Sequence, residues 1–237
     1  MSKKYSLKKV LVLVSVLALP GLLYFLLQEK GQNRYRPLEI FGPKQVASTF
    51  HTKRGVKIPD TIYHQIRDFK LLSHTGDSVG FPTDSNRIAL VNFFFINCDS
   101  FCGEMNRQMA RVVKTFGDNR RLTYYSISVD PERDTQEALR AYANTMQASA
   151  RHWYFLTGNR GLIYSVARKD FLVDAHTGEQ QNLIHSPMMI LVDRDKRIRG
   201  YYDSTSKEQM DKLIDEIKVL ITEDVRNVNI LKPKKVI

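Results

Sequence analysis

Apolar side chains recur with two different periods between residues 58 and 224, and the alternation of these periods predicts strands and helices in turn. Residues 88–96 form an almost unbroken apolar run, which is typical of a central strand covered on both faces. Residues 104–116 instead carry apolar side chains at helical spacing and stop at Gly117. The pattern therefore predicts a buried strand that leads directly into an amphipathic helix.

The flanking segments extend this alternation. The other predicted strands are 69–72, 78–81, 122–129, 153–156, 188–192 and 198–202, and the other predicted helices are 135–146, 160–168 and 207–221. We expect Asp134 to cap the helix at 135–146. A hairpin, a βαβαβα series, a second hairpin and a final helix together predict an α/β domain of the thioredoxin-like fold, with a central mixed sheet flanked by helices and an N-terminal hairpin extension.

The first thirty residues predict a membrane anchor. Residues 10–27 are an uncharged, mostly aliphatic run just long enough to span a bilayer. Lys3, Lys4, Lys8 and Lys9 precede it, and such residues stay on the cytoplasmic side. We therefore expect a single-pass protein of the bacterial inner membrane, with residues 1–9 in the cytoplasm and the bulk of the chain in the periplasm or outside the cell. A cleaved signal peptide is the alternative, although the run is long for one and no small-x-small cleavage site follows it.

The rest of the chain divides into a linker at 28–57, which we interpret as leading into the domain through one strand, a single domain at 58–224, and a basic tail at 225–237. The net charge of +11 includes the four lysines before the anchor, and the other basic residues are scattered. A nucleic-acid-binding protein would instead gather Lys and Arg on one element. The composition therefore argues against a nucleic-acid partner.

The chain has two cysteines, Cys98 and Cys102, and both follow the predicted central strand. If Cys102 opens the next helix, the two thiols can lie on one face, where they could hold a soft metal ion or form a reversible disulfide. The alternative is a pair of buried core residues. The position favours chemistry, because ligands bind at the carboxyl ends of such strands and a helix N-terminus favours a thiolate.

A third metal ligand would have to come from elsewhere, and the chain has six histidines: His51, His64, His74, His152, His176 and His185. We expect most of them to be surface or hydrogen-bonded polar residues. His185 differs, because it precedes the hairpin strand that lies beside the central strand in this fold. Two thiolates and an imidazole suit Cu(I), whereas structural zinc would need a fourth ligand such as Asp99 or Asp130.

Four ordered blocks resemble the Sco/SenC family: Cys-x-x-x-Cys after an apolar strand, Ser-Val-Asp-Pro-Glu-Arg-Asp-Thr at 128–135, Tyr-Phe-Leu-Thr-Gly at 154–158, and His-Ser at 185–186 before Leu-Val-Asp at 191–193. The resemblance covers residues 58–221. It implies a membrane-tethered copper chaperone that helps to assemble the copper centre of cytochrome c oxidase, with that enzyme's copper-binding subunit or another copper protein as partner. It also implies that Cys98, Cys102 and His185 bind copper, as Cu(I) and alternatively as Cu(II), and that Asp130 and Asp134 lie in an acidic loop nearby.

The chain departs from the family pattern in two places, of which the first bears on copper binding and the second keeps another function open. Family members usually carry proline after each cysteine, where this chain has Asp99 and Gly103. Pro187 resembles the cis-proline that precedes the hairpin strand in membrane-anchored thiol-disulfide oxidoreductases, although those enzymes typically use Cys-x-x-Cys. The alternative function is therefore an oxidoreductase whose redox pair, Cys98 and Cys102, keeps the cysteines of a copper-receiving protein reduced.

Overall fold

The computed structural model describes residues 7–30, 37–82, 87–117, 119–148, 152–173 and 186–231. The chain forms two compact units, Met1–Arg36 and Pro37–Ile237. In the first unit, α1 (Leu7–Lys30) is a continuous helix that contains Pro20. Between residues 12 and 25 its large apolar side chains are exposed. Over the residues described here, no helix was found that is long and apolar enough to cross a membrane.

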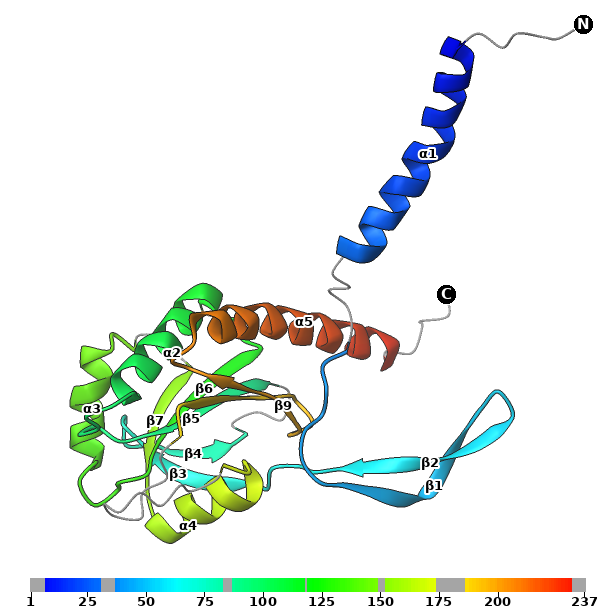
Figure 1. Cartoon of the computed structure of the whole chain (residues 1–237). Coiled ribbons are helices and arrows are strands. Elements are labelled where there is room, and N and C mark those ends of the chain that lie inside the picture. Colours follow the sequence, from blue (N-terminus) through cyan, green and yellow to red (C-terminus); the bar gives the residue numbers. More distant parts are fainter. Residues whose placement is uncertain are drawn as a thin grey trace, which may run out of the picture. The chain divides into compact units, whose positions relative to one another are not determined.

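The second unit is built on a seven-stranded sheet of order β4-β3-β7-β6-β5-β8-β9 (Figure 1). Its strands are β3 (Phe69–Ser73), β4 (Ser78–Phe81), β5 (Ile88–Phe94), β6 (Leu122–Ser128), β7 (Trp153–Thr157), β8 (Met188–Val192) and β9 (Ile198–Asp203). Strands β5, β6 and β7 pair in parallel, and the other pairs are antiparallel. The predicted central mixed sheet is therefore confirmed.

Helices cover both faces of this sheet. Buried residues of α2 (Cys102–Phe116), α3 (Gln136–Thr145) and α5 (Lys207–Leu231) share one apolar core, and those of α4 (Arg160–Ser165) and its π-helical continuation η1 (Val166–Asp170) share the other. Strand β5 contributes Leu90 to the first core and Val91 to the second. Every residue of β5 is buried. The apolar run of β5 is therefore explained by cover on both of its faces, as the sequence predicted.

Two details of the helices differ from the prediction. Asp134 does not cap α3, because Thr135 is the N-cap and its hydroxyl accepts a hydrogen bond from the Ala138 amide at 3.3 Å. Asp134 is buried beneath a loop instead. The last helix continues to Leu231 rather than ending near residue 221.

The prediction missed a separate two-stranded hairpin. Strands β1 (Lys44–Lys53) and β2 (Val56–Tyr63) pair with each other in antiparallel fashion, within the stretch interpreted as a linker and one strand. Figure 1 shows its tip pointing away from the seven-stranded sheet. Both strands are exposed over most of their length. They therefore lack the alternation of buried apolar and exposed polar residues from which a half-buried strand is recognised.

Candidate metal centre

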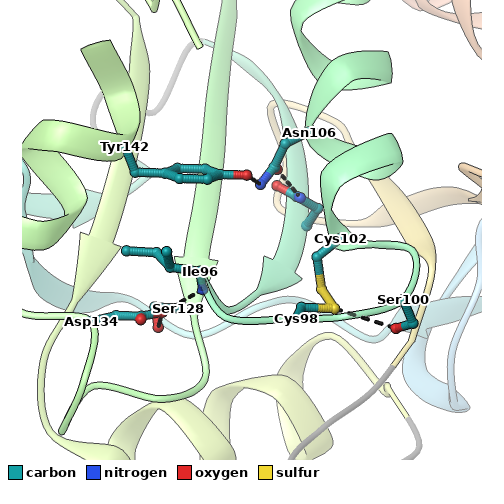
Figure 2. Close-up of a disulfide and its surroundings, with 9 residues drawn as sticks. Ile96, Cys98, Ser100, Cys102, Asn106, Ser128, Asp134 and Tyr142 are labelled. Atoms are coloured by element: carbon teal, nitrogen blue, oxygen red, sulfur yellow. Dashed lines mark hydrogen bonds between the residues drawn. A yellow bond between two sulfur atoms is a disulfide. The ribbon is translucent and has the colours of Figure 1, made fainter. Parts of the chain in front are cut away.

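The two cysteines lie side by side where β5 gives way to α2. Cys98 is in the connecting loop and Cys102 is the first residue of α2. Their Cα atoms are 5.9 Å apart and a disulfide joins them (Figure 2). The proximity predicted from their spacing is confirmed, and the pair is in its oxidised form. A disulfide between residues four apart shows that both sulfurs can reach one point in space.

The two sulfurs differ in their surroundings. Cys102 is only 3% exposed and belongs to the core between α2 and the sheet, whereas Cys98 is half-buried. The Cys98 Sγ lies 3.3 Å from the Ser100 hydroxyl, in a hydrogen bond drawn in Figure 2. Cys102 occupies the helix N-terminus, where unpaired amide N–H groups and the helix dipole favour negative charge. For a reduced Cys102, the helix N-terminus favours the thiolate, whereas burial in the apolar core favours the thiol.

Asp134 holds the loop that leads to Cys98. Its carboxylate accepts hydrogen bonds from the Ile96 amide at 3.1 Å and from the Ser128 hydroxyl at 2.6 Å (Figure 2). The residue is 2% exposed. Burial raises the pKa of this carboxyl above its ordinary value, and the two hydrogen bonds partly oppose that change. Asp134 thus fixes the backbone two residues before Cys98.

Replacing Asp134 with Asn tests this role through the pH dependence of stability. Because the folded pKa is raised, the carboxyl's contribution to the free energy of unfolding is complete below its unfolded pKa of about 4 and is lost as pH rises through the folded value. Asn keeps an acceptor oxygen but does not titrate. We therefore expect the stability of the parent relative to Asp134→Asn to fall as pH rises from about 4 towards neutrality. Urea unfolding across this pH range measures the difference in stability between the parent and the variant. A difference that does not change with pH would contradict the raised pKa of Asp134.

Asp130, the other acidic residue expected near the site, lies closer to the surface. Its carboxylate faces Arg133 at 3.7 Å in an ion pair. Its backbone carbonyl accepts hydrogen bonds from the amides of Arg133 and Asp134. The structure therefore connects Asp130 to the turn that positions Asp134.

A polar network that lies one helical turn from Cys102 was not predicted from the sequence. The Asn92 amide donates to the Asn106 side-chain oxygen at 2.9 Å, and the Asn106 amide donates to the Tyr142 hydroxyl at 2.9 Å (Figure 2). The Ser126 hydroxyl donates to Asn92 at 2.7 Å and accepts from the Trp153 ring N–H at 3.1 Å. These bonds tie α2, one turn after Cys102, to β5, β6, β7 and α3. The available signal was an asparagine inside each of two otherwise buried apolar patterns.

The histidines that the structure describes make hydrogen bonds to residues other than the cysteines. The His51 ring bonds to Asp60, His64 to the Asp170 carbonyl, His74 to the Phe155 amide and His152 to Arg87. Burial lowers the pKa of His74. These contacts agree with the expectation that most of the histidines are polar residues with structural hydrogen bonds.

The predicted third ligand, His185, lies outside the described residues, as does His176. Within the described ranges, no group of three or more His, Cys, Asp or Glu side chains could hold a metal ion. Among those residues, the Phe81–Pro82 bond is a cis peptide.

Comparison with known proteins assigns the family. The SCO1/SenC family model matches residues 60–222, which include the whole seven-stranded sheet and the cysteine pair. The chain belongs to the SCO1/SenC family. A SCO1 homologue of Bacillus subtilis is 29% identical over 168 residues, covering 69% of this chain and 86% of the relative. A SCO2-like protein of Rickettsia typhi is 26% identical over 219 residues, covering 89% and 98% of the two chains.

Solved structures of SCO1/SenC proteins share the fold. A family lipoprotein from Bacillus anthracis superposes with a TM-score of 0.61 at 23% identity, covering 67% of this chain and 95% of the other. BsSco, described as a cytochrome c oxidase assembly protein with a disulfide switch, superposes with a TM-score of 0.56 at 25% identity, covering 67% and 94%. Arabidopsis thaliana ScoI, solved with copper bound, gives 0.53 at 23% identity, covering 64% and 97%.

Proposed function

We propose that this SCO1/SenC protein binds copper through Cys98, Cys102 and His185 and delivers it to a copper protein, the copper-binding subunit of cytochrome c oxidase or another recipient. The observation that carries the proposal is the pair of sulfurs at the N-terminus of α2, in a chain of this family. Relatives described as cytochrome c oxidase assembly proteins or solved with copper bound support it. Thiolate sulfur and imidazole nitrogen are donors that suit Cu(I).

Chain connectivity supports His185 as the third ligand. The next residue, Ser186, leads into β8, and Met189 of β8 pairs with Asn92 of β5. Strand β8 runs antiparallel to β5, so it begins at the edge of the sheet where β5 ends. The cysteine loop leaves from that same edge. The shared position of these two chain segments supports the choice of His185 as the third ligand.

Copper binding requires the reduced form of the cysteine pair. Two electrons and two protons convert the disulfide into two thiols, and binding a metal then releases the thiol protons. A dithiol reductant outside the cytoplasm is the class of molecule that can supply these electrons. Asp99, which stands where relatives usually carry proline, is exposed beside Cys98.

We also propose that residues 10–27 anchor the protein in the bacterial inner membrane, with the SCO1/SenC domain outside the cytoplasm. Support comes from the uncharged run, the lysines before it and the exposed apolar side chains of α1. A helix that is apolar all round needs an apolar environment. Resistance of the full chain to carbonate extraction tests the anchor, and release of a shortened protein would instead support a cleaved signal.

The experiment that tests the ligand set is His185→Ala in the full chain, solubilised and reduced. We expect one copper per parent chain, a copper affinity lowered by at least about tenfold in the variant, and unimpaired formation of the Cys98–Cys102 disulfide. Competition with a Cu(I) chelator measures the affinity, and X-ray absorption counts sulfur and nitrogen ligands. The matched control is His51→Ala, because His51 lies on the β1–β2 hairpin. Equal affinities for the parent and His185→Ala would contradict the assignment.

The disulfide itself supports the second candidate, a thiol-disulfide oxidoreductase acting on the cysteines of a copper-receiving protein. The half-buried Cys98 sulfur is the accessible one for exchange with a partner thiol. This function requires no copper. Rapid reduction of a protein disulfide by the copper-free, reduced chain, retained in His185→Ala, would favour this second function over copper delivery.

A further inference from the structure

The β1–β2 hairpin has no explanation in the proposed copper function. The family match begins at residue 60, near the end of β2, so most of the hairpin lies outside it. Its strands pair with each other and not with the seven-stranded sheet. A two-stranded hairpin is at best marginally stable alone in water. Its exposed surface is therefore a candidate for contact with another molecule.

The hairpin is unusually rich in exposed apolar side chains. Among the described residues outside α1, most of the large apolar side chains that are exposed lie on it: Val46, Phe50, Val56, Ile58 and Ile62. Val56, which adjoins the turn, is 63% exposed, and Phe50, which pairs with Pro59 further along the hairpin, is 60% exposed. Such clustering marks an interaction surface, whereas single exposed apolar residues are ordinary.

Positive charge is concentrated at the same end. Arg54 and Gly55 form the two-residue turn of the hairpin, and Lys53 and Lys57 lie on the strands next to it. Arg54 has a φ of 51°, a backbone conformation that Asn or Asp adopts more readily in such turns. The Lys57 ammonium lies 5.3 Å from the centre of the Phe50 ring. This end of the hairpin therefore combines three cations with the exposed apolar side chains of Phe50, Val56 and Ile58.

The edges of the hairpin are poorly suited to binding another strand. Pro59 in β2 has no amide proton to donate, and a register shift interrupts the pairing between Val46 and Phe50. Proline, bulges and lysines are the features by which exposed strands resist edge-to-edge pairing. The available surface is thus the basic, apolar tip and not the backbone edges.

We propose that this tip binds the surface of an anionic phospholipid bilayer. Lys53, Arg54 and Lys57 match the headgroup phosphates in charge, while Phe50 and Val56 reach the boundary of the acyl chains. Proximity to the bilayer rests on the proposed anchor. Lys44, where β1 begins, is 14 residues after Lys30, where α1 ends, and such a stretch spans at most about 50 Å when fully extended. With the proposed anchor in a membrane, this length of chain keeps the start of the hairpin within reach of a bilayer surface of complementary charge.

The test places a fluorescent reporter at the tip of the full chain. The native Trp153 is 2% exposed and provides a constant background, so Phe50→Trp reports on the hairpin. The variant is reconstituted in nanodiscs of phosphatidylcholine alone or mixed with phosphatidylglycerol, with brominated acyl chains as quencher. We expect quenching that requires phosphatidylglycerol and is weakened by salt. Leu162→Trp is the matched reporter control, because Leu162 lies exposed on α4 and should show no such dependence.

Neutralising the tip supplies the second arm of the test. Each basic residue at an anionic surface strengthens attraction about fivefold. Lys53→Gln, Arg54→Gln and Lys57→Gln together should therefore lower the tip–lipid equilibrium roughly 100-fold and abolish the quenching. The same change at three exposed lysines elsewhere, Lys70, Lys114 and Lys207, should leave it intact. The salt dependence of quenching is measured in the Phe50→Trp chain with its basic residues intact. It therefore tests the proposal even if the neutralised hairpin fails to fold.

Several outcomes would overturn the proposal. Quenching that is equal in neutral and anionic nanodiscs, or that survives neutralisation of the tip, would exclude headgroup recognition. A Phe50→Trp signal that responds to protein concentration in detergent but not to lipid would identify a second copy of the chain as the partner. A chain that shows no quenching but still resists carbonate extraction would contradict this inference and leave the proposed anchor supported. Copper affinity should not change in the tip variants. Its measurement therefore tests the copper function independently of lipid binding by the tip.

Discussion

Replacing Cys98 and Cys102 together with serine is expected to abolish tight copper binding. The alcohol of serine stays protonated at neutral pH and is a poor ligand for a soft ion, so the site would keep only the proposed imidazole. Removing even an outer partner of a metal ligand typically costs 10–100-fold in affinity, and the loss of both sulfurs should exceed about 100-fold. Competition with a Cu(I) chelator, against the reduced parent, measures the change.

The comparison with the reduced parent matters because it leaves no disulfide in either protein. Ser100→Ala is the control, since Ser100 contacts the Cys98 sulfur without being a proposed ligand. It should keep most of the copper affinity. A double serine variant that still bound one copper ion as tightly as the parent would place the metal elsewhere in the chain.

The second large effect is expected on stability, from Asn106→Leu. Leucine fills a similar volume but leaves the Asn92 amide and the Tyr142 hydroxyl without their hydrogen-bond partner. An unsatisfied buried group costs about 1–3 kcal/mol. Asn92 is fully buried and Tyr142 is half-buried, so the free energy of unfolding should fall by roughly 1–3 kcal/mol. Burial raises the pKa of Tyr142 above its ordinary value, so its hydroxyl is protonated at neutral pH. Urea unfolding at neutral pH measures the loss.

The neighbouring residue supplies the matched control. Arg107 is exposed, and its guanidinium pairs with Glu104 on the same helix surface at 2.8 Å. Exposed pairs of this kind contribute a few tenths of a kcal/mol, so Arg107→Ala should change stability by less than about 0.5 kcal/mol. If Asn106→Leu were equally mild, the network would be a consequence of the packing and not a support for α2.

The elements that could be predicted from sequence are those whose side chains alternate between core and solvent or are buried throughout. Strand β5 and helix α2 belong to this class, and so does the closeness of Cys98 to Cys102, which depends only on local spacing. The central mixed sheet followed from the order of such elements.

The features that escaped prediction depend on contacts between distant segments or on the absence of any buried face. Asp134 has the residue type and position of a helix cap, but tertiary burial gives it the Ile96 amide and Ser128 instead. The Asn92–Asn106 bond joins a strand to a helix, and no local pattern encodes such a pair. The β1–β2 hairpin escaped because its strands have no core to face.

The unequal burial of the two sulfurs gives the cysteine pair a direction. An incoming thiolate can approach the half-buried Cys98, while Cys102 is enclosed by the core at the start of α2. Attack at Cys98 forms a mixed disulfide there and releases Cys102 as the leaving thiolate, into the position where the helix dipole favours its charge. Exchange through this pair is therefore polarised, with Cys98 turned towards other molecules and Cys102 towards the protein.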